Sequence, residues 1–168
     1  MKKMKIGRPL YCTWVIGLLM LSEAATADSD ATVATLLLRD VPPSGVVFEV
    51  VQGDPDGLNR AIPVVRGYIE KLRARFPEIP VAVISHGQEQ FSLLRENRQA
   101  FEETHALASS FLSELAVPVQ VCGNHAGMYG HGAGDYPDYV EVVDAAPRQL
   151  RRYRELGYEV VVVQRIQG

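Results

Sequence analysis

The stretch from Val117 to Gly132 reads VPVQVCGNHAGMYGHG and joins a strand-like run to a glycine-rich turn. Its valines alternate with Pro118 and Gln120, a pattern typical of a strand that begins near the proline. The run ends at the Cys-Gly-Asn sequence of residues 122–124, where a turn leaves backbone N–H groups free to point at the cysteine sulfur. This arrangement makes Cys122 a candidate nucleophile.

Apolar segments on both sides of this stretch predict the rest of a sheet. β-Branched runs indicate four further strands, at 46–51, 81–84, 139–143 and 159–163. Apolar residues at helical spacing indicate three helices, at 62–76, at 99–115, and between Asp144 as N-cap and Gly157 as C-cap, with Leu156 on the buried face of the third. This alternation predicts an α/β fold: a single three-layer domain over residues 46–168, with a mostly parallel five-stranded sheet and helices on both faces.

Three candidate site residues follow three different strands of this predicted sheet. Ligands bind beyond the carboxyl ends of the strands in open parallel sheets. We therefore expect Asp54 and His86 to line a substrate site, together with Gly123 and Asn124, around Cys122. A single strand between those of His86 and Cys122 would separate their ends by about 10 Å.

The N-terminal residues have the pattern of a secretory signal peptide. Four basic residues precede an apolar run at 14–21 that is too short to span a bilayer, and the small residues at 25–27 fit cleavage before Asp28. We expect residues 1–27 to be removed on export to a periplasm, leaving a soluble product without membrane attachment. Residues 28–45 are interpreted as an N-terminal arm outside the core.

Charge, cysteine content and motifs limit the function. Without residues 1–27, 13 Lys+Arg face 19 Asp+Glu, a formal net charge of −6 that argues against a nucleic-acid partner. Cys12 is lost with the signal peptide, so Cys122 has no partner for an intramolecular disulfide in a compartment that favours disulfides. The chain has no Walker A, GxSxG or HExxH pattern, so nucleotide-binding and classical hydrolase functions lack support.

The pattern around Cys122 leaves three interpretations open. In the first, its thiolate accepts and passes on sulfur, and His125 with nearby backbone N–H groups stabilises the anion. In the second, Cys122, His125 and either His86 or His131 hold copper(I) or zinc in a non-enzymatic binding module for a metal or small ligand. The single Cys-x-x-His pair is not diagnostic of a metal site, so no metal is assigned. In the third, Cys122 is a buried apolar side chain of a structural subunit.

Residues 46–163 resemble the DsrE/DsrF-like family of sulfur-relay proteins. The resemblance rests on VVFEVV at 46–51, LAVPVQVCGN at 115–124 and RELGYEVVVV at 154–163, and its most specific element is Cys-Gly-Asn. It implies a sulfurtransferase-like carrier without a cofactor, in which Cys122 holds sulfur as a persulfide. It also implies a trimer or hexamer that exchanges sulfur with donor and acceptor proteins or small sulfane-sulfur compounds.

Two features depart from the family pattern. Family members often continue from the cysteine into a helix, whereas the glycines between residues 123 and 134 favour a turn here. The family's well-understood sulfur relays also work in the cytoplasm, whereas this chain carries an export signal. Sulfur-compound oxidation outside the cytoplasm is the hypothesis that follows.

Overall fold

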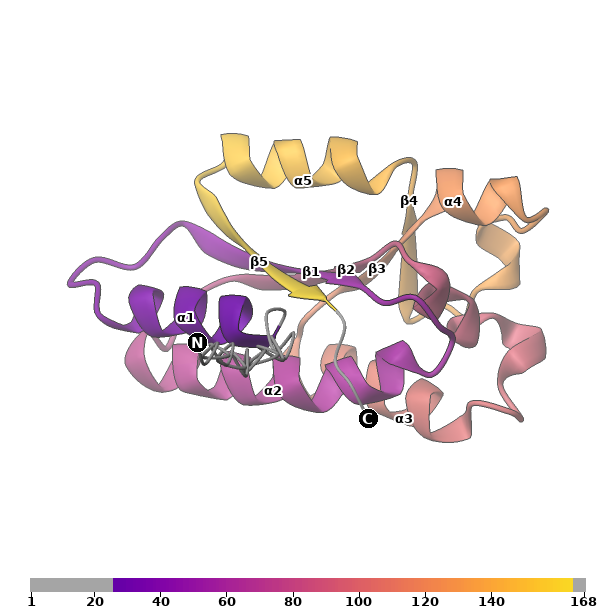
Figure 1. Ribbon diagram of the computed structural model, residues 1–168, viewed down its shortest axis with the longest axis horizontal. Coiled ribbons are helices and arrows are strands. Elements are labelled where there is room, and N and C mark those ends of the chain that lie inside the picture. The colour runs from indigo at the N-terminus through magenta and orange to yellow at the C-terminus, as the bar shows by residue number, and fades with distance from the viewer. Residues whose placement is uncertain (1–25, 165–168) are drawn as a thin grey trace, which may run out of the picture.

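The computed structural model describes residues 26–164, which form one parallel sheet between two layers of helices (Figure 1). In chain order the α-helices and strands are α1 (Thr26–Leu37), β1 (Gly45–Val51), α2 (Gly57–Arg75), β2 (Val81–Ser85), α3 (Glu102–Leu115), β3 (Val119–Cys122), α4 (Gly123–Met128), β4 (Val140–Val143), α5 (Ala146–Glu155) and β5 (Tyr158–Gln164). Three short 3₁₀ helices complete the order: η1 (Gln88–Leu93), η2 (Arg95–Asn97) and η3 (Ala133–Asp135). The predicted three-layer α/β fold is confirmed.

The strand order is β4-β3-β2-β1-β5, and all four neighbouring pairs are parallel. The strands lie within two residues of their predicted bounds, whereas α2 begins earlier than predicted and α3 later. Because β2 and β3 are neighbours, no strand separates the one that precedes His86 from the one that ends at Cys122. The carboxyl ends of the three central strands therefore meet at one edge of the sheet.

Alternation along the strands divides the core between the two faces of the sheet. Phe48 of β1 belongs to the larger apolar cluster, which lies under α1, α2 and α3. Val47, its neighbour in sequence, belongs to a smaller cluster under α5. Figure 1 shows α1, α2 and α3 on one side of the sheet, with α5 and α4 on the other. The smaller cluster consists of Val47, Ala82, Ile84, Cys122, Val143, Ala146 and Leu150.

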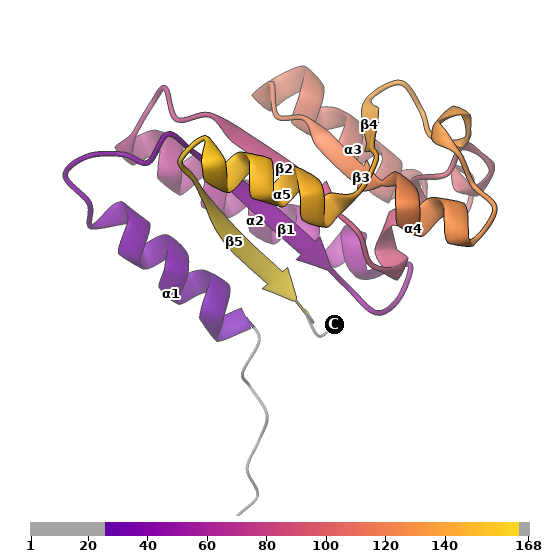
Figure 2. The same ribbon diagram turned by 90° about the horizontal axis from the view of Figure 1, so that it is seen from above.

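Helix α1 corrects the prediction that residues 28–45 form an arm outside the core. Val33 and Leu36 of this helix are 2% and 1% exposed and belong to the larger cluster. Ser29 also shares a hydrogen bond with the Tyr68 hydroxyl of α2 at 3.1 Å. Figure 2 shows α1 beside β5, where it covers the end of the sheet that α2 and α3 leave open. Two apolar side chains one helical turn apart are enough to place this segment in the core.

Helix α4 corrects the expectation that the glycine-rich segment is a turn. Its six residues begin directly after Cys122, which is the N-cap. The backbone N–H of Asn124 donates to the carbonyl of Asp144 at 2.8 Å, and Ala126 is completely buried. A Cβ on Gly123 would lie 3.0 Å from the carbonyl oxygen of Val143. Contacts with the end of β4 therefore outweigh the low helix propensity of glycine.

Helix α5 differs from its prediction at both ends. Its N-cap is Ala145, and the carboxylate of Asp144 pairs with Arg148 at 3.4 Å instead of capping the helix. The helix ends at Glu155, so Leu156 is 65% exposed and does not share the buried face. Gly157, predicted to end the helix, adopts a φ of +81°, which favours glycine.

The predicted signal peptide lies almost wholly outside the described residues and stays a prediction. Its cleavage point, before Asp28, falls in the first turn of α1. Within residues 26–164, no helix combines the length and the apolar character needed to cross a membrane.

Candidate functional site

Cys122 lies at the carboxyl edge of the sheet, where β3 ends and α4 begins. Its side chain is on the α5 face and packs in the smaller apolar cluster, with 5% of the residue exposed. Cys122 is the one cysteine among the described residues, and it is a free thiol. The sulfur is therefore at the predicted edge but covered by aliphatic side chains.

Two hydrogen bonds hold Cys122 in place. Its backbone N–H donates to the side-chain oxygen of Gln90 at 3.0 Å. The pairing of β2 with β3 ends one residue earlier, so this side chain takes the place of a backbone acceptor on β2. Its Sγ accepts the backbone N–H of Ala146 at 3.4 Å. Ala146 is the first residue of α5, and its N–H is one of those that a helix leaves without an internal partner. A helix N-terminus favours negative charge, so this donor stabilises a thiolate.

The donor to the sulfur is not the one expected from the sequence. The turn after Cys122 was expected to turn its N–H groups toward the sulfur, but Asn124 donates to the Asp144 carbonyl. The actual donor comes from α5, 24 residues further along the chain. No local pattern in the sequence indicates this contact, because it depends on how β4 and α5 pack beside β3.

His125 is held away from the sulfur by a different hydrogen bond. Its Nδ1 donates to the backbone carbonyl of His86 at 2.8 Å. The ring makes edge contacts with Phe91 and Tyr129, at centroid distances of 5.3 and 5.4 Å. It makes no hydrogen bond to Cys122 in the described part of the chain. His125 thus connects α4 to the end of β2. Its contribution to the site is to hold these two elements in position.

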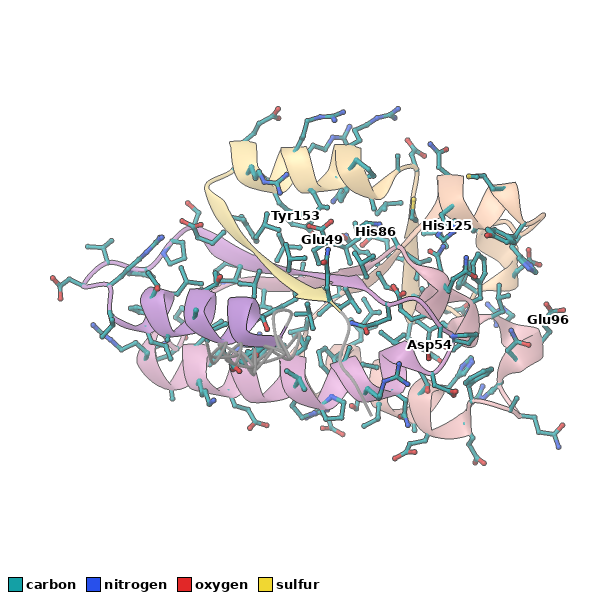
Figure 3. All side chains as sticks on the ribbon, in the orientation of Figure 1. Glu49, Asp54, His86, Glu96, His125 and Tyr153 are labelled. Atoms are coloured by element: carbon teal, nitrogen blue, oxygen red, sulfur yellow. The ribbon has the colours of Figure 1, made fainter. Side chains whose placement is uncertain are left out.

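His86 directly follows β2, the strand next to the one that ends at Cys122. The β2–β3 pairing ends at Ser85 and Val121, and His86 and Cys122 are the residues that follow these two in the sequence. The Nε2 of His86 is 2.8 Å from a carboxylate oxygen of Glu49, and both side chains are half-buried. Figure 3 shows Glu49 and His86 close together, with His125 beyond them toward α4.

Glu49 was missed by the sequence analysis, although a signal was present. It is the one charged residue within the apolar run VVFEVV of β1. A carboxylate on a covered strand requires a polar partner, and His86 supplies it. The pair orients the imidazole at the edge of the site, because a carboxylate bound to one ring nitrogen fixes the ring.

Gln90 and Tyr136 are buried polar residues that local sequence patterns did not indicate. The amide nitrogen of Gln90 and the hydroxyl of Tyr136 have no hydrogen-bond partner among the described residues. Burial raises the pKa of the Tyr136 hydroxyl, and the negative charge of Asp135 adds to this effect. The phenol therefore stays protonated, and both groups are buried donors without an acceptor in the described part of the chain.

Asp54 does not join the other candidate residues. Its carboxylate pairs with Arg60 of α2 at 2.6 Å, and its carbonyl accepts the N–H of Gly57. Figure 3 places Asp54 on the α2 side of the sheet, apart from Glu49, His86 and His125. Its contacts fix the start of α2.

Gly123 and Asn124 line an open pocket of about 430 Å³ next to Cys122. The pocket also contains Val143, which pairs with Cys122 across β3 and β4, and the charged side chains of Asp144 and Arg148. Gly123 and Asn124, which were predicted to bind substrate, therefore lie at a surface that a small molecule can reach. The sulfur lies behind this surface.

The geometry gives no support to the metal interpretation. Within residues 26–164, no three His, Cys, Asp or Glu side chains are close enough together to hold a metal ion. His125 turns its Nδ1 to a carbonyl, and His86 turns its Nε2 to Glu49. His131 lies 3.9 Å from Asp135, and its ring packs against Phe91 at a centroid distance of 5.8 Å.

Comparisons with known proteins identify the fold class. No protein-family model matches the chain, and no curated protein matches it. The chain is similar to the solved structure of MTH1491, a protein of unknown function from Methanobacterium thermoautotrophicum, with 16% identity and a TM-score of 0.52 over 70% of this chain and 98% of that one. This likeness shows a shared three-layer α/β fold.

Two further solved structures are similar to the chain. The ychN protein from E. coli is 18% identical, with a TM-score of 0.48 over 72% of this chain and 99% of that one. BT1422 from Bacteroides thetaiotaomicron, a conserved protein of unknown function, is 11% identical, with a TM-score of 0.49 over 69% of this chain and 94% of that one. None of the three names states an activity, so the function must be argued from the site.

Proposed function

We propose that this protein is a sulfur carrier in which Cys122 accepts a sulfane sulfur and passes it on as a persulfide. The observation that carries the proposal is the hydrogen bond from the N–H of Ala146 to Sγ at the carboxyl edge of the sheet. It gives a thiolate a fixed donor at a helix N-terminus.

The proposed transfer is a pair of thiol exchanges that balance without an oxidant. The Cys122 thiolate attacks the outer sulfur of a donor persulfide, and a new S–S bond forms. The donor's own S–S bond breaks, and its thiolate leaves with the bonding electrons. An acceptor thiolate then attacks the outer sulfur of the Cys122 persulfide and restores the free thiolate.

Access to the sulfur is part of the proposal. The pocket lined by Gly123 and Asn124 leads a small donor to the end of β3, but Cys122 itself is buried. Transfer therefore requires a movement of α4 or of the start of α5. Helix α4 has six residues, three of which are exposed glycine, methionine or asparagine, so few buried contacts hold it in place.

Two further properties belong to the proposal. Residues 1–27 direct export to a periplasm, where the donor is a small reduced sulfur compound or another protein. The chain assembles as a homo-oligomer, a trimer or hexamer, as the family resemblance implies. Cell fractionation and native mass measurement test these two properties separately.

Intact-mass measurement after exposure to glutathione persulfide tests the carrier function. We expect the folded wild-type protein to gain the mass of one sulfur atom, which a thiol reductant removes, and the Cys122→Ser variant to gain none. A matched sample unfolded in urea shows that the donor is active. Modification of the unfolded wild type alone would contradict the proposal.

A structural role for the cysteine is the second candidate, because Cys122 is 5% exposed within an aliphatic cluster. The rate of alkylation separates the two candidates. Slow alkylation of the folded protein beside fast alkylation of the unfolded protein, together with no persulfide, would assign Cys122 to packing.

A further inference from the structure

Helix α5 presents four arginines to solvent from the layer that covers Cys122. Its buried residues, Ala146 and Leu150, pack in the smaller apolar cluster. The arginines are all exposed, and we call them the α5 arginine face: Arg148, Arg151, Arg152 and Arg154. Figures 1 and 2 show that α5 lies over the middle of the sheet with its outer side open.

The charge of this face contrasts with the rest of the chain. With Glu155, α5 carries a formal charge of +3, whereas the whole chain carries −3, so all other residues together carry −6. Arg148 pairs with Asp144 at 3.4 Å. Among residues 26–164, Arg151, Arg152 and Arg154 form no ion pair. A concentrated positive charge therefore stands on an otherwise acidic protein.

The stability of α5 does not account for these arginines. Cations in the last turn, as at Arg152 and Arg154, favour a helix, but Arg148 is in the first turn, where positive charge is unfavourable. Arg148 and Arg152 are four residues apart, and Arg151 and Arg154 are three apart. Like charges at these spacings repel on a helix surface and destabilise it. The arrangement therefore suits a partner better than the isolated helix.

The position of the face connects it to the candidate site. The first N–H of α5 bonds to the sulfur of Cys122, and Arg148 lines the pocket beside Gly123. Leu156, just past the end of the helix, is 65% exposed and offers an apolar contact beside the charges. Arginine is enriched at protein interfaces.

We propose that the α5 arginine face binds an acidic segment of a partner protein, and, granted the proposed carrier function, that this partner exchanges sulfur with Cys122. The ten residues of α5 span about 15 Å, which matches a short acidic segment. A nucleic acid or an anionic membrane has a more extended field and would also meet the acidic remainder of the chain. Charge complementarity thus favours a protein partner.

Fluorescence anisotropy with a short fluorescein-labelled polyglutamate peptide tests the surface. We expect the wild-type chain to bind the peptide, more weakly as salt rises, and the Arg151→Glu/Arg154→Glu variant to bind at least about tenfold more weakly, because attraction becomes repulsion. The matched control is Lys71→Glu/Arg98→Glu, which makes the same change of net charge at exposed positions outside α5. The control should bind within about twofold of the wild type. Equal binding by the wild type and the Arg151/Arg154 variant, both folded by circular dichroism, would overturn the proposal.

Two further measurements separate this proposal from its alternatives. Tighter binding of a single-stranded oligonucleotide or of phosphatidylglycerol vesicles, lost in the same Arg151/Arg154 variant, would assign the face to nucleic acid or membrane and overturn it. Persulfide loading of that variant by glutathione persulfide should equal that of the wild type, and Cys122→Ser should still bind the peptide. The docking surface and the carrier function can therefore fail independently.

Discussion

Glu89 lies completely buried at the carboxyl edge between β1 and β2, where its carboxylate accepts three hydrogen bonds. The donors are the backbone N–H groups of Gln52 and Gly87, at 2.7 and 2.9 Å, and the hydroxyl of Ser85, at 2.6 Å. A buried carboxylate is tolerated when its oxygens are satisfied in this way. Glu89 thus holds the ends of two strands next to the candidate site.

The substitution Glu89→Gln tests this role at nearly constant volume. Its amide nitrogen has to face a backbone or hydroxyl donor, so at least one hydrogen bond to a charged acceptor is lost. We expect a decrease of about 1.5–3 kcal/mol in the free energy of unfolding. Urea denaturation measures the change. An unchanged transition midpoint would show that the carboxylate is not needed for stability.

His105 illustrates how one buried side chain makes stability depend on pH. Burial lowers the pKa of its imidazole, and the nearby positive charge of Arg98 adds to this effect. The neutral ring donates from Nε2 to the carbonyl of Ser92 at 2.9 Å, so its Nδ1 accepts from the hydroxyl of Tyr139. The folded protein therefore binds a proton at His105 less readily than the unfolded chain.

The sign of the pH effect follows from this lowered pKa. The unfolded chain takes up a proton near the ordinary histidine value of 6.5, before the folded protein does. The stability due to neutral His105 is complete above that pH and is lost as the pH falls toward the folded-state value. We expect the wild type to lose more unfolding free energy between about pH 7.5 and 5.5 than a His105→Gln variant. Parallel losses in urea titrations would contradict this assignment.

At the scale of elements, α1 and α4 show how packing overrides local sequence signals. Helix α1 belongs to the core because Val33 and Leu36 reach the larger cluster, although its sequence also contains small and polar residues typical of a linker. Helix α4 forms despite its glycines because Asn124 and Gly123 contact the end of β4. In both cases, contacts distant in sequence decide the structure.

A pair of leucines in and after α1 provides a matched test of its place in the core. Leu36 is 1% exposed, whereas Leu38, just past the end of the helix, is 84% exposed. We expect Leu36→Ala to lower the free energy of unfolding by about 2–5 kcal/mol and Leu38→Ala to change it by less than about 0.5 kcal/mol. Thermal or urea denaturation of both variants measures the difference. Similar small effects for both would return residues 28–45 to the role of an outer arm.

At the scale of the molecule, the sequence predicted the sheet well and the site in part. Runs such as VVFEVV located the strands, because buried parallel strands are continuously apolar. The carboxyl edge was predicted from topology, and β3 delivers Cys122 there. Asp54 lies elsewhere because its ion pair with Arg60 fixes it to α2.

The remaining features of the site depend on long-range packing. The donor to the sulfur comes from α5, the acceptor for the Cys122 N–H comes from Gln90, and Glu49 of β1 contacts His86 at the end of the neighbouring strand β2. None of these pairs has a fixed spacing in the sequence. Side-chain directions at the edge of a sheet are set only when the strand order and the covering helices are known.

The pairing of β5 with β1 has a consequence for how the chain acquires its structure during synthesis. β1 joins its second neighbour only through seven residues at 158–164, more than a hundred positions later. As a nascent polypeptide leaves the ribosome, β1 therefore keeps an open flank until the residues of β5 have been synthesised. Such non-local closure is slow and exposes an unpaired strand to aggregation. A chaperone or an early translocation step that shields β1 during this interval would raise the yield of native protein.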